Sequence, residues 1–359
     1  MTQESLKIQS ATKEYSIVTG HDFETIQSLT TLENAFFVID SNVYELHNEL
    51  FKAIPEDRLF LLKAVETGKT VQMALDICER IMTLPAKRNA TLVSFGGGIT
   101  QDITGFAANI LYRGIHWIFV PTTLLAACDS CIGGKTSLNY KGYKNLLGTF
   151  YPPDEIYICT AFFNTLSRRD LLSGLGEIVK FNLMQDEQTL DHLEKSVQLL
   201  LSGDLQTMEQ FVLSSLKFKR HFIEEDEFDH GERIKLNFAH TFGHAYEVVS
   251  NYEIPHGIAV SMGMVTANYI SVKRGLLSQQ LARRMEKVLW AVVEDKAYQK
   301  PFDCEKIISA IRKDKKQTDQ QITAVLLTEN YDLNIAHDLT ADEVREAVSY
   351  FSDRLAERL

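Results

Sequence analysis

Three histidines lie within seventeen residues of one another, although the chain of 359 residues contains only ten. His240 and His244 are four positions apart in the segment NFAHTFGH and therefore share one face if that segment is helical. His256 follows them, but Thr241 occupies the glutamate position of a zincin motif. Imidazole is a common zinc ligand, and a catalytic zinc ion typically takes three protein ligands. The spacing predicts a metal site built from two of these histidines and a carboxylate.

A glutamate and a lysine stand out in the otherwise apolar segment GLGEIVK. Glu177 and Lys180 are three positions apart, so they are neighbours on one face of a helix. A structural ion pair accounts for them, and so does a ligand site beside the small residues. The sequence alone leaves both interpretations open.

The glycine-rich segment FGGGITQD, residues 95–102, follows an apolar run and opens a predicted helix. Glycines there let backbone N–H groups approach a phosphate at the positive end of the helix. Gln101 occupies the third glycine of the Rossmann fingerprint, so a plain tight turn is the alternative to a phosphate-binding turn.

A second glycine pair precedes Lys135 in the segment DSCIGGKT. Asp129 occupies the first glycine of a Walker A motif, which disfavours a nucleoside triphosphatase. Lys144 and Asn145 follow within ten residues of Lys135. Lysines beside glycines in an acidic protein predict a local anion site, with exposed loop lysines as the alternative.

The elements that must position these residues fall into two regions. Apolar runs of strand length alternate with helical patterns, and this implies a parallel sheet covered on both faces, as in nucleotide-binding α/β domains. The runs span 35–39, 59–62, 91–95, 117–120 and 156–158, with helical patterns at 71–84 and 99–112. Helical periods broken near Gly203, Asp229, Pro255 and Gly275 then lead to a hairpin at 322–327 and 331–335 and a last helix from Ala341. We expect an α/β domain over residues 1–166 and a mostly helical domain over 167–359.

The composition restricts the partners. A formal net charge of −11 disfavours nucleic acid and anionic membranes, which require basic surface. No apolar run approaches the length of a membrane span, and the polar start of the chain has no secretory pattern, so a cytoplasmic protein is expected. Five scattered cysteines are interpreted as buried small hydrophobic residues, the CxxC pair at Cys128 and Cys131 included.

Several separated motifs together resemble the 3-dehydroquinate synthase family and, more widely, the sugar-phosphate cyclases. The motifs are GGGITQDITGF, YRGI, VPTTLLAACDSCIGGKT, KNLLGTFYPP, LSGLGEIVK, NFAHTFGHAYE and HGIAVSMGM. Their order and spacing match the family from about residue 36 to 275. The resemblance implies a Rossmann-like α/β domain followed by a helical domain, which agrees with the division drawn above.

The resemblance also implies the cofactors and their residues. Zinc, or cobalt, would be held by Glu177, His240 and His256, which leaves His244 for the substrate. NAD would lie on Gly96, Gly97, Gly98 and Asp102, with Asp40, Asn42, Glu66 and Lys69 towards its adenosine half. Further NAD positions of the family fall on Thr122, Thr123, Asp129, Lys144, Thr165 and Leu166.

Substrate contacts carry over in the same way. Phosphate and polar-group binders of the family match Lys135, Asn145, Asn237, His244 and either Lys315 or Lys316, of which Lys316 is preferred. Lys180, Lys219 and Arg233 match residues around the hydroxyl groups and carboxylate, and Asp129 is also expected near the substrate. The residues expected to be catalytic are Lys180, His244, Lys135, Lys219, Arg233 and Asn237. Arg113 matches an arginine supplied across the interface of a homodimer.

The implied reaction converts 3-deoxy-D-arabino-heptulosonate 7-phosphate into 3-dehydroquinate and phosphate by oxidation, phosphate elimination, reduction and intramolecular aldol closure. An acidic substrate is expected because a guanidinium suits carboxylate recognition and Arg233 is retained. An amino-dehydroquinate synthase and a metal-dependent polyol dehydrogenase of the same superfold are the alternatives. The chain departs from the family pattern at Gln101, Ser137, Ala239 and Ile258, of which the first three stand where the family has glycine.

Overall fold

The computed structural model describes residues 5–85, 87–293, 301–314 and 321–358. The chain forms two compact units, one of residues 1–167 and 208–228 and the other of residues 168–207 and 229–359. The first break lies one residue from the domain boundary expected from the sequence. The segment 208–228, expected in the helical domain, groups instead with the first unit.

The first unit is built on a seven-stranded sheet in the order β1-β2-β9-β6-β5-β3-β4. All pairs in it are parallel except β1 with β2. The strands are β1 (Ser5–Ile8), β2 (Tyr15–Gly20), β3 (Ala35–Asp40), β4 (Leu59–Leu62), β5 (Thr91–Gly96), β6 (His116–Pro121) and β9 (Glu155–Cys159). The five strands expected from apolar runs are confirmed, whereas β1 and β2 were not predicted.

The register brings the carboxyl ends of three strands to one level. Ile39 of β3 pairs with Phe95 of β5, which pairs with Val120 of β6. The chain leaves β3 towards β4 and leaves β5 towards β6, on opposite sides. Ligands of open α/β sheets bind beyond the carboxyl ends of the strands at such a switch point.

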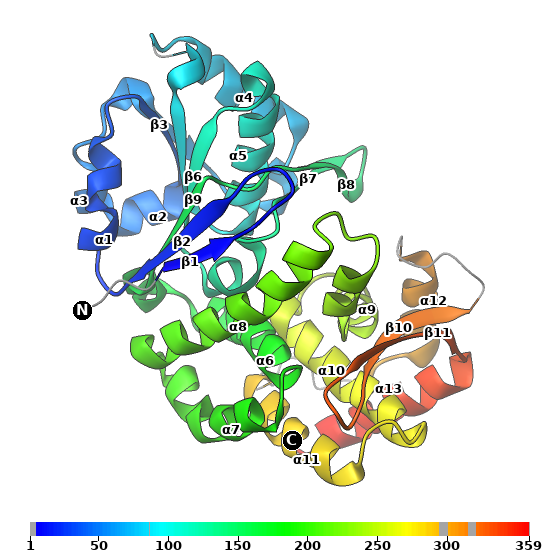
Figure 1. The fold of residues 1–359 in the computed structure, drawn as a ribbon. Helices are drawn as coiled ribbons and strands as arrows, with labels where there is room; N and C mark the ends of the chain where they lie inside the picture. The colour runs from blue at the N-terminus through cyan, green and yellow to red at the C-terminus, as the bar shows by residue number, and fades with distance from the viewer. Residues whose placement is uncertain (1–4, 86, 294–300, 315–320, 359) are drawn as a thin grey trace. The chain divides into compact units, whose positions relative to one another are not determined.

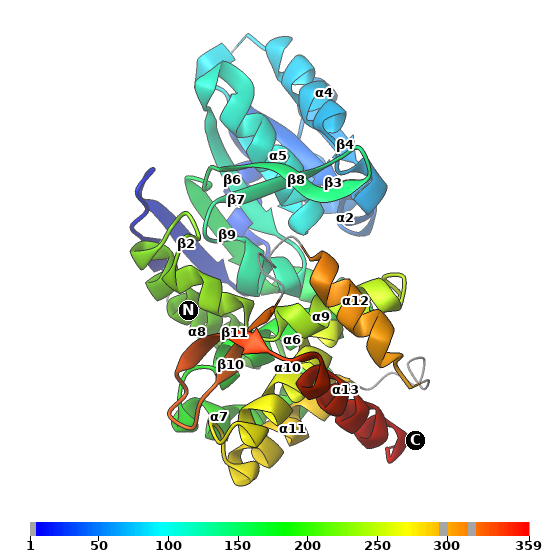
Figure 2. The same ribbon diagram turned by 90° about the vertical axis from the view of Figure 1, so that its right-hand side faces the viewer.

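This unit also contains the helices α1 (Glu24–Gln27), α2 (Ser41–Leu46), α3 (Asn48–Phe51), α4 (Val71–Met82) and α5 (Gly98–Ile110). Figures 1 and 2 show α4 and α5 side by side against the sheet. Both were expected and end two residues before the predicted limits. The lysine-rich segment after the second glycine pair is a hairpin of β7 (Lys135–Tyr140) and β8 (Tyr143–Phe150), and β7 packs along α5.

Helix α8 (Leu205–Glu225) explains why 208–228 belongs to the first unit. Buried Lys219 donates to the backbone oxygen of Asp129 at 2.6 Å and to its Oδ1 at 2.7 Å. The Gln9 N–H donates to Glu224 Oε1 at 3.0 Å, beside strand β1. These contacts join the end of the helix to residues far away in the sequence, which helical periodicity cannot reveal.

The second unit surrounds one buried helix, α10 (His256–Lys273), which contacts α6, α9, α11 and α13. The other helices are α6 (Arg168–Leu183), α7 (Glu187–Ser202), α9 (His240–Val249), α11 (Gln279–Val292), α12 (Cys304–Lys313) and α13 (Ala341–Ala356). Every residue of α10 from Gly257 to Asn268 is buried, as expected of a helix enclosed by others. The predicted break at Gly203 is confirmed by its left-handed backbone after α7, with φ of 86°.

A two-stranded hairpin of β10 (Ile322–Leu327) and β11 (Leu333–Leu339) precedes α13. The predicted hairpin and its first strand are confirmed, but the second strand begins at Leu333 instead of residue 331 and continues to Leu339, beyond the predicted end at residue 335. Tyr331 has φ of 64° and donates its N–H to Thr328 O, so it belongs to the turn. The last helix begins at Ala341, as predicted.

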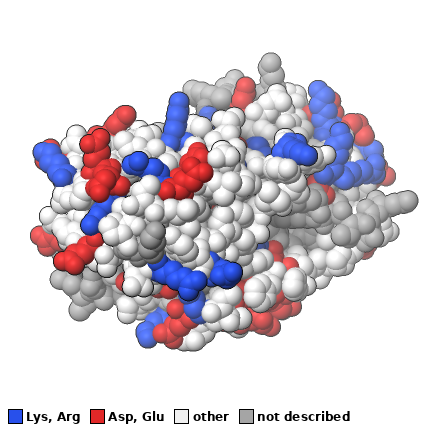
Figure 3. All heavy atoms as spheres, turned by 90° about the horizontal axis from the view of Figure 1, so that it is seen from above, with Lys and Arg blue, Asp and Glu red and all other residues white. Residues whose placement is uncertain are grey.

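Acidic and basic side chains are interspersed on the face shown in Figure 3. Within the described part of the chain, no helix is long and apolar enough to cross a membrane. None of the five cysteines forms a disulfide bond. Four of them are buried, which confirms their interpretation as small interior residues, whereas Cys304 is only partly buried.

We predict that Glu343→Gln lowers the free energy of unfolding by about 1–2 kcal/mol at pH 7. Glu343 caps α13 through Thr340 and accepts hydrogen bonds from Arg274, which lower its pKa to about 2. A depressed carboxyl pKa stabilises the fold above the ordinary value near 4.5, and this contribution is lost as pH falls towards 2.

Urea denaturation of both proteins at pH 7 and at pH 3.5 checks this prediction, because the difference should shrink at the lower pH. Glu346→Gln on the same helix is the control, since Glu346 is exposed and lies 4.0 Å from Lys273. An equal effect of the two substitutions, or a difference independent of pH, would contradict the assignment.

Candidate metal centre and nucleotide-binding turn

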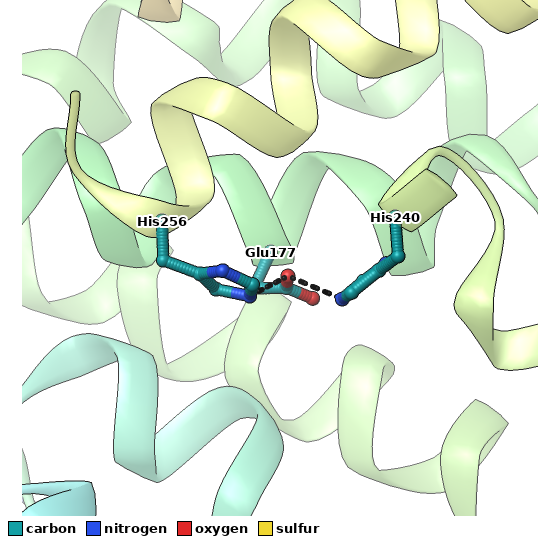
Figure 4. A group of neighbouring side chains, drawn as sticks. All are labelled: Glu177, His240 and His256. Atoms are coloured by element: carbon teal, nitrogen blue, oxygen red, sulfur yellow. Dashed lines mark ion pairs between the residues drawn. The ribbon is translucent and has the colours of Figure 1, made fainter. Parts of the chain in front are cut away.

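The carboxylate of Glu177 on α6 is the centre of a polar group in the second unit (Figure 4). Its side chain is 0% exposed. Oε2 lies 2.5 Å from Lys180 Nζ, and this confirms that the two side chains share one face. Oε1 lies 3.2 Å from His256 Nε2 and 3.6 Å from His240 Nε2. One oxygen therefore faces an ammonium group and the other faces two imidazoles from two other helices.

Close contact between α6 and α10 explains this arrangement. A Cβ on Gly176 would lie 2.0 Å from Gly257 O, and one on Gly257 would lie 1.8 Å from Ser173 O. Only glycine permits this approach of two backbones. Because Gly176 precedes Glu177 and Gly257 follows His256, the same contact brings the carboxylate and the imidazole together.

The other nitrogen of each imidazole has a partner that orients the ring. His240 Nδ1 lies 3.0 Å from the carbonyl oxygen of Phe238. His256 Nδ1 lies 3.4 Å from Glu247 Oε1. An acceptor at Nδ1 fixes the proton there and leaves Nε2 as the metal-binding atom, an arrangement common at metal-ligating histidines.

Glu177, His240 and His256 can hold a metal ion, since one ligand atom from each lies within 4.8 Å of the others. Two imidazoles and a carboxylate are a donor set that zinc accepts, and three ligands leave one position for substrate. Burial lowers the pKa of His256, but hydrogen bonds and charge from Glu177 and Glu247 raise it to about 10. The carboxylates of Glu177 and Glu247 thus favour a positive charge at the position of the His256 imidazole.

The described residues contain a second such group, formed by His244, Glu247 and His256. His244 lies one turn after His240, with ring centroids 5.3 Å apart, which confirms that they share a helix face. Its Nδ1 is 3.1 Å from Asp314 Oδ2. Sequence reasoning missed Glu247 and Asp314, although Glu247 follows His244 at i+3. Lys315 and Lys316 lie outside the described residues.

Ala239, immediately before α9, has a left-handed backbone with φ of 68°. Such a conformation costs a residue with a side chain about 1 kcal/mol more than glycine. The structure therefore gives a physical reason for the glycine that the family pattern has at this position, and the present chain tolerates the strain.

The turn between β5 and α5 has the geometry of a phosphate site in the first unit. Gly97 precedes the 13-residue helix, whose first N–H groups have no partner within the helix. A Cβ on Gly97 would lie 3.0 Å from Thr123 Cγ2, whereas one on Gly98 would meet its nearest neighbour, Ser130 Oγ, at 3.7 Å. The Thr122 N–H donates to Gly96 O at 2.9 Å, which joins this turn to the end of β6.

Asp40 stands at the end of the adjacent strand β3 and accepts from the Asn42 N–H at 3.0 Å. Burial raises the pKa of Asp40, against the effect of that hydrogen bond. The carboxyl ends of β3, β5 and β6 thus hold five of the residues expected to bind NAD, namely Asp40, Gly97, Gly98, Thr122 and Thr123. These residues lie where open parallel sheets bind dinucleotides, beyond the carboxyl ends of the strands.

Three other predicted residues of this unit, Lys69, Asp102 and Asn145, meet in one polar cluster. Lys69 Nζ lies 2.5 Å from Asp102 Oδ2 and 2.7 Å from Asn145 Oδ1. Burial raises the pKa of Asp102, whereas Lys69 and Ser137 lower it, and the net direction is upward. Glu66 lies beside the cluster and accepts from Asn139 Nδ2 at 2.8 Å.

The remaining predicted residues are divided between the units. In the first unit, Asp129 forms an ion pair with Lys219. Thr165 Oγ1 lies 3.2 Å from His47 Nε2, and Leu166 follows in the same turn. The other predicted residues of this unit are exposed, namely Arg113, Lys135 and Lys144. In the second, Arg233 is buried and Asn237 donates to Ile234 O at 2.9 Å, both just before α9.

A parallel α/β unit with an open glycine turn, followed by a helical unit with a glutamate and two histidines, is the arrangement of the dehydroquinate synthase-like sugar-phosphate cyclases. The solved 2-epi-5-epi-valiolone synthase of Streptomyces hygroscopicus subsp. jinggangensis 5008, with NAD+ and Zn2+ bound, has a TM-score of 0.83 and 25% identity over 95% of this chain and 97% of that one. A solved 2-deoxy-scyllo-inosose synthase, complexed with carbaglucose-6-phosphate, NAD+ and Co2+, has a TM-score of 0.82 and 24% identity, and the match covers 96% of this chain and 99% of that one.

Family models for the N-terminal and C-terminal parts of 3-dehydroquinate synthase match residues 59–173 and 174–317. The 3-dehydroquinate synthase of Dictyoglomus thermophilum is 33% identical over 349 residues, which cover 96% of this chain and 98% of that protein. The chain belongs to the 3-dehydroquinate synthase family. It is therefore an enzyme, a lyase-type cyclase. Its residues Glu177, His240 and His256 form a group that could hold a metal ion.

We predict that His240→Ala and His244→Ala differ in metal binding although the two residues lie one turn apart. Loss of His240 removes a ligand and should weaken zinc binding about 100-fold or more, whereas the His244 variant should keep one tightly bound ion. Zinc content after dialysis, with a titration of the metal-free proteins, measures the difference. Retention by the His240 variant and loss by the His244 variant would instead place the ion in the second group.

Proposed function

We propose that this protein converts 3-deoxy-D-arabino-heptulosonate 7-phosphate into 3-dehydroquinate and inorganic phosphate. The observation that carries the proposal is the Glu177 carboxylate, fully buried between Lys180 and the Nε2 atoms of His240 and His256. Zinc or cobalt bound there supplies a Lewis acid for a substrate hydroxyl, and bound NAD+ supplies a reversible hydride acceptor. The relatives named 3-dehydroquinate synthase support the choice of substrate.

Lys180 supplies a fixed positive charge beside the proposed ligand set. Its side chain is 2% exposed, and its Nζ lies 4.2 Å from the centre of the Phe181 ring as well as 2.5 Å from Glu177. A preorganised ammonium group stabilises negative charge that develops on an oxygen during deprotonation. We therefore assign Lys180 to the hydroxyl group that is oxidised and later restored.

His244 is suited to proton transfer because it is neither buried nor one of the three proposed ligands. Its Nδ1 lies 3.1 Å from Asp314 Oδ2, and an acceptor at that position favours the tautomer in which Nε2 can accept a proton. The side chain is 31% exposed, so substrate and water can reach it. We assign it to proton transfers near the departing phosphate.

The acidic substrate carries a phosphate and a carboxylate, and we assign polar and cationic residues to each group. Arg233 and Lys219 are assigned to the carboxylate and hydroxyl groups, since a planar guanidinium can bind a carboxylate through two hydrogen bonds. Lys135, Asn145 and Asn237 are assigned to the phosphate and neighbouring polar groups. Lys316 is assigned with them from the sequence.

We also propose a cytoplasmic homodimer. Cysteines without disulfide bonds are typical of a reducing compartment. Arg113 is exposed on a turn with φ of 66°, where it is accessible to a second copy of the chain. Sedimentation equilibrium of the wild type and of Arg113→Ala, with turnover of each, tests the assembly and the role of this arginine.

The decisive experiment incubates the protein with the heptulosonate phosphate, NAD+ and zinc, and follows phosphate, 3-dehydroquinate and reduced nicotinamide together. We expect equal amounts of phosphate and 3-dehydroquinate with no net NADH, because the hydride returns to the product. Lys180→Met should reduce turnover about 100-fold or more, as loss of a preorganised charge usually does.

Glucose 6-phosphate, which has no carboxylate, is the control substrate and should release no phosphate. Phosphate release from glucose 6-phosphate instead would indicate a cyclase of neutral sugars. Accumulation of NADH without phosphate release would indicate a polyol dehydrogenase and contradict the proposal.

A further inference from the structure

Ser137 on β7 connects Asp102, which the family resemblance assigns to NAD, with Asn145, which the proposed function assigns to the phosphate and neighbouring polar groups. Its backbone N–H donates to Asp102 Oδ1 at 3.0 Å, and its Oγ lies 3.0 Å from Asp102 Oδ2. The same Oγ lies 2.9 Å from Asn145 Oδ1 and accepts from Lys69 Nζ at 3.0 Å. Asp102 belongs to the first turns of α5, behind the nucleotide-binding glycines, whereas Asn145 belongs to the β7–β8 hairpin.

All three N–H donors of the Lys69 ammonium group are used within this cluster. An ammonium group has three donors, and Lys69 Nζ has Asp102, Ser137 and Asn145 at 2.5, 3.0 and 2.7 Å. The residue is 6% exposed, so water does not replace these partners. Lys69 therefore holds the carboxylate, the hydroxyl and the amide oxygen around itself.

The hydroxyl group of Ser137 is the adjustable member of the cluster. It carries one proton, accepts from Lys69, and has two acceptors within reach, Asp102 Oδ2 and Asn145 Oδ1. The single hydroxyl proton can form a well-aligned hydrogen bond with only one of these two acceptors at a time. A displacement of the α5 turn or of the hairpin therefore changes the hydrogen bonding of the other.

We propose that Ser137 is a positioning residue that couples nucleotide binding at the turn between β5 and α5 to anion binding on the β7–β8 hairpin. The inference rests on the proposed function for the identity of the two ligands. NAD+ would fix the α5 side of the cluster, and the phosphate group would fix the hairpin side. The ligand that binds first therefore orders part of the cluster, and the second ligand loses less free energy in ordering the rest. The binding of NAD+ and of a phosphate group should therefore be mutually favourable.

Isothermal titration of metal-loaded enzyme with NAD+, in the absence and presence of saturating inorganic phosphate, measures the coupling directly. In the wild type we expect phosphate to tighten NAD+ binding about fivefold or more. In Ser137→Ala this factor should fall to about one, with higher KM values for NAD+ and substrate and little change in kcat. Ser137→Thr retains the hydroxyl and should restore most of the coupling.

Thr136→Val is the matched control, because the Thr136 hydroxyl is buried in the same hairpin and pairs with Thr149 Oγ1 at 2.8 Å, outside the cluster. It should lower stability without changing the coupling factor. Coupling that is absent from the wild type, retained by Ser137→Ala or lost equally in Thr136→Val would overturn the inference. The proposed function fails separately, by lack of 3-dehydroquinate formation in the wild type, because the titration does not depend on turnover.

Discussion

The burial of the Glu177 carboxylate is the constraint on which the second unit depends. A carboxylate removed from water loses several kcal/mol of hydration, and only close positive charge and good hydrogen bonds offset that loss. Lys180 supplies one cation at Oε2, and the imidazoles of His240 and His256 face Oε1. A bound metal ion would complete the compensation, which links metal binding to the stability of this unit.

The packing around this carboxylate follows from the same constraint. Helices α6 and α10 touch at Gly176 and Gly257, so the residues next to those glycines are held side by side. Helix α10 is enclosed by its neighbours and has little freedom to shift, which fixes His256 at its first turn. Phe238 O and Glu247 then orient the two rings. Backbone contact, helix burial and ring orientation together define one ligand geometry.

The first unit is subject to a different constraint. Many polar groups lie at one edge of its parallel sheet, and each of them needs a hydrogen-bond or ion-pair partner. Asp40 accepts a backbone N–H, Lys219 neutralises Asp129, and the cluster of Lys69, Asp102, Ser137 and Asn145 satisfies its own donors. Gln101 also contributes, since it exchanges two hydrogen bonds of 2.6 Å with Ser130. These pairs hold the glycine turn and the segment after β6 in a fixed relation.

Sequence patterns predicted the parts of this structure that rest on local periodicity. The strands β3, β5 and β6 are continuous apolar runs, and the His240 and His244 pair is recognisable from its spacing. The hairpin of β7 and β8 was missed because most of its residues are polar. Strand β7 alternates in burial, but one of its two buried positions is Thr136, and β8 has no buried residue. Contacts made across long sequence separations, such as Lys219 with Asp129 or His244 with Asp314, leave no local signal. The choice of Glu177 as third ligand came from the family resemblance and not from spacing.

The central claim is that one metal ion sits between Glu177, His240 and His256. Anomalous diffraction at the zinc absorption edge, from crystals of the metal-loaded protein, tests it most directly. The account predicts one strong peak about 2.0–2.2 Å from Glu177 Oε1 and from the Nε2 atoms of His240 and His256. A peak between His244, Glu247 and His256, with Glu177 bound only to Lys180, would contradict it.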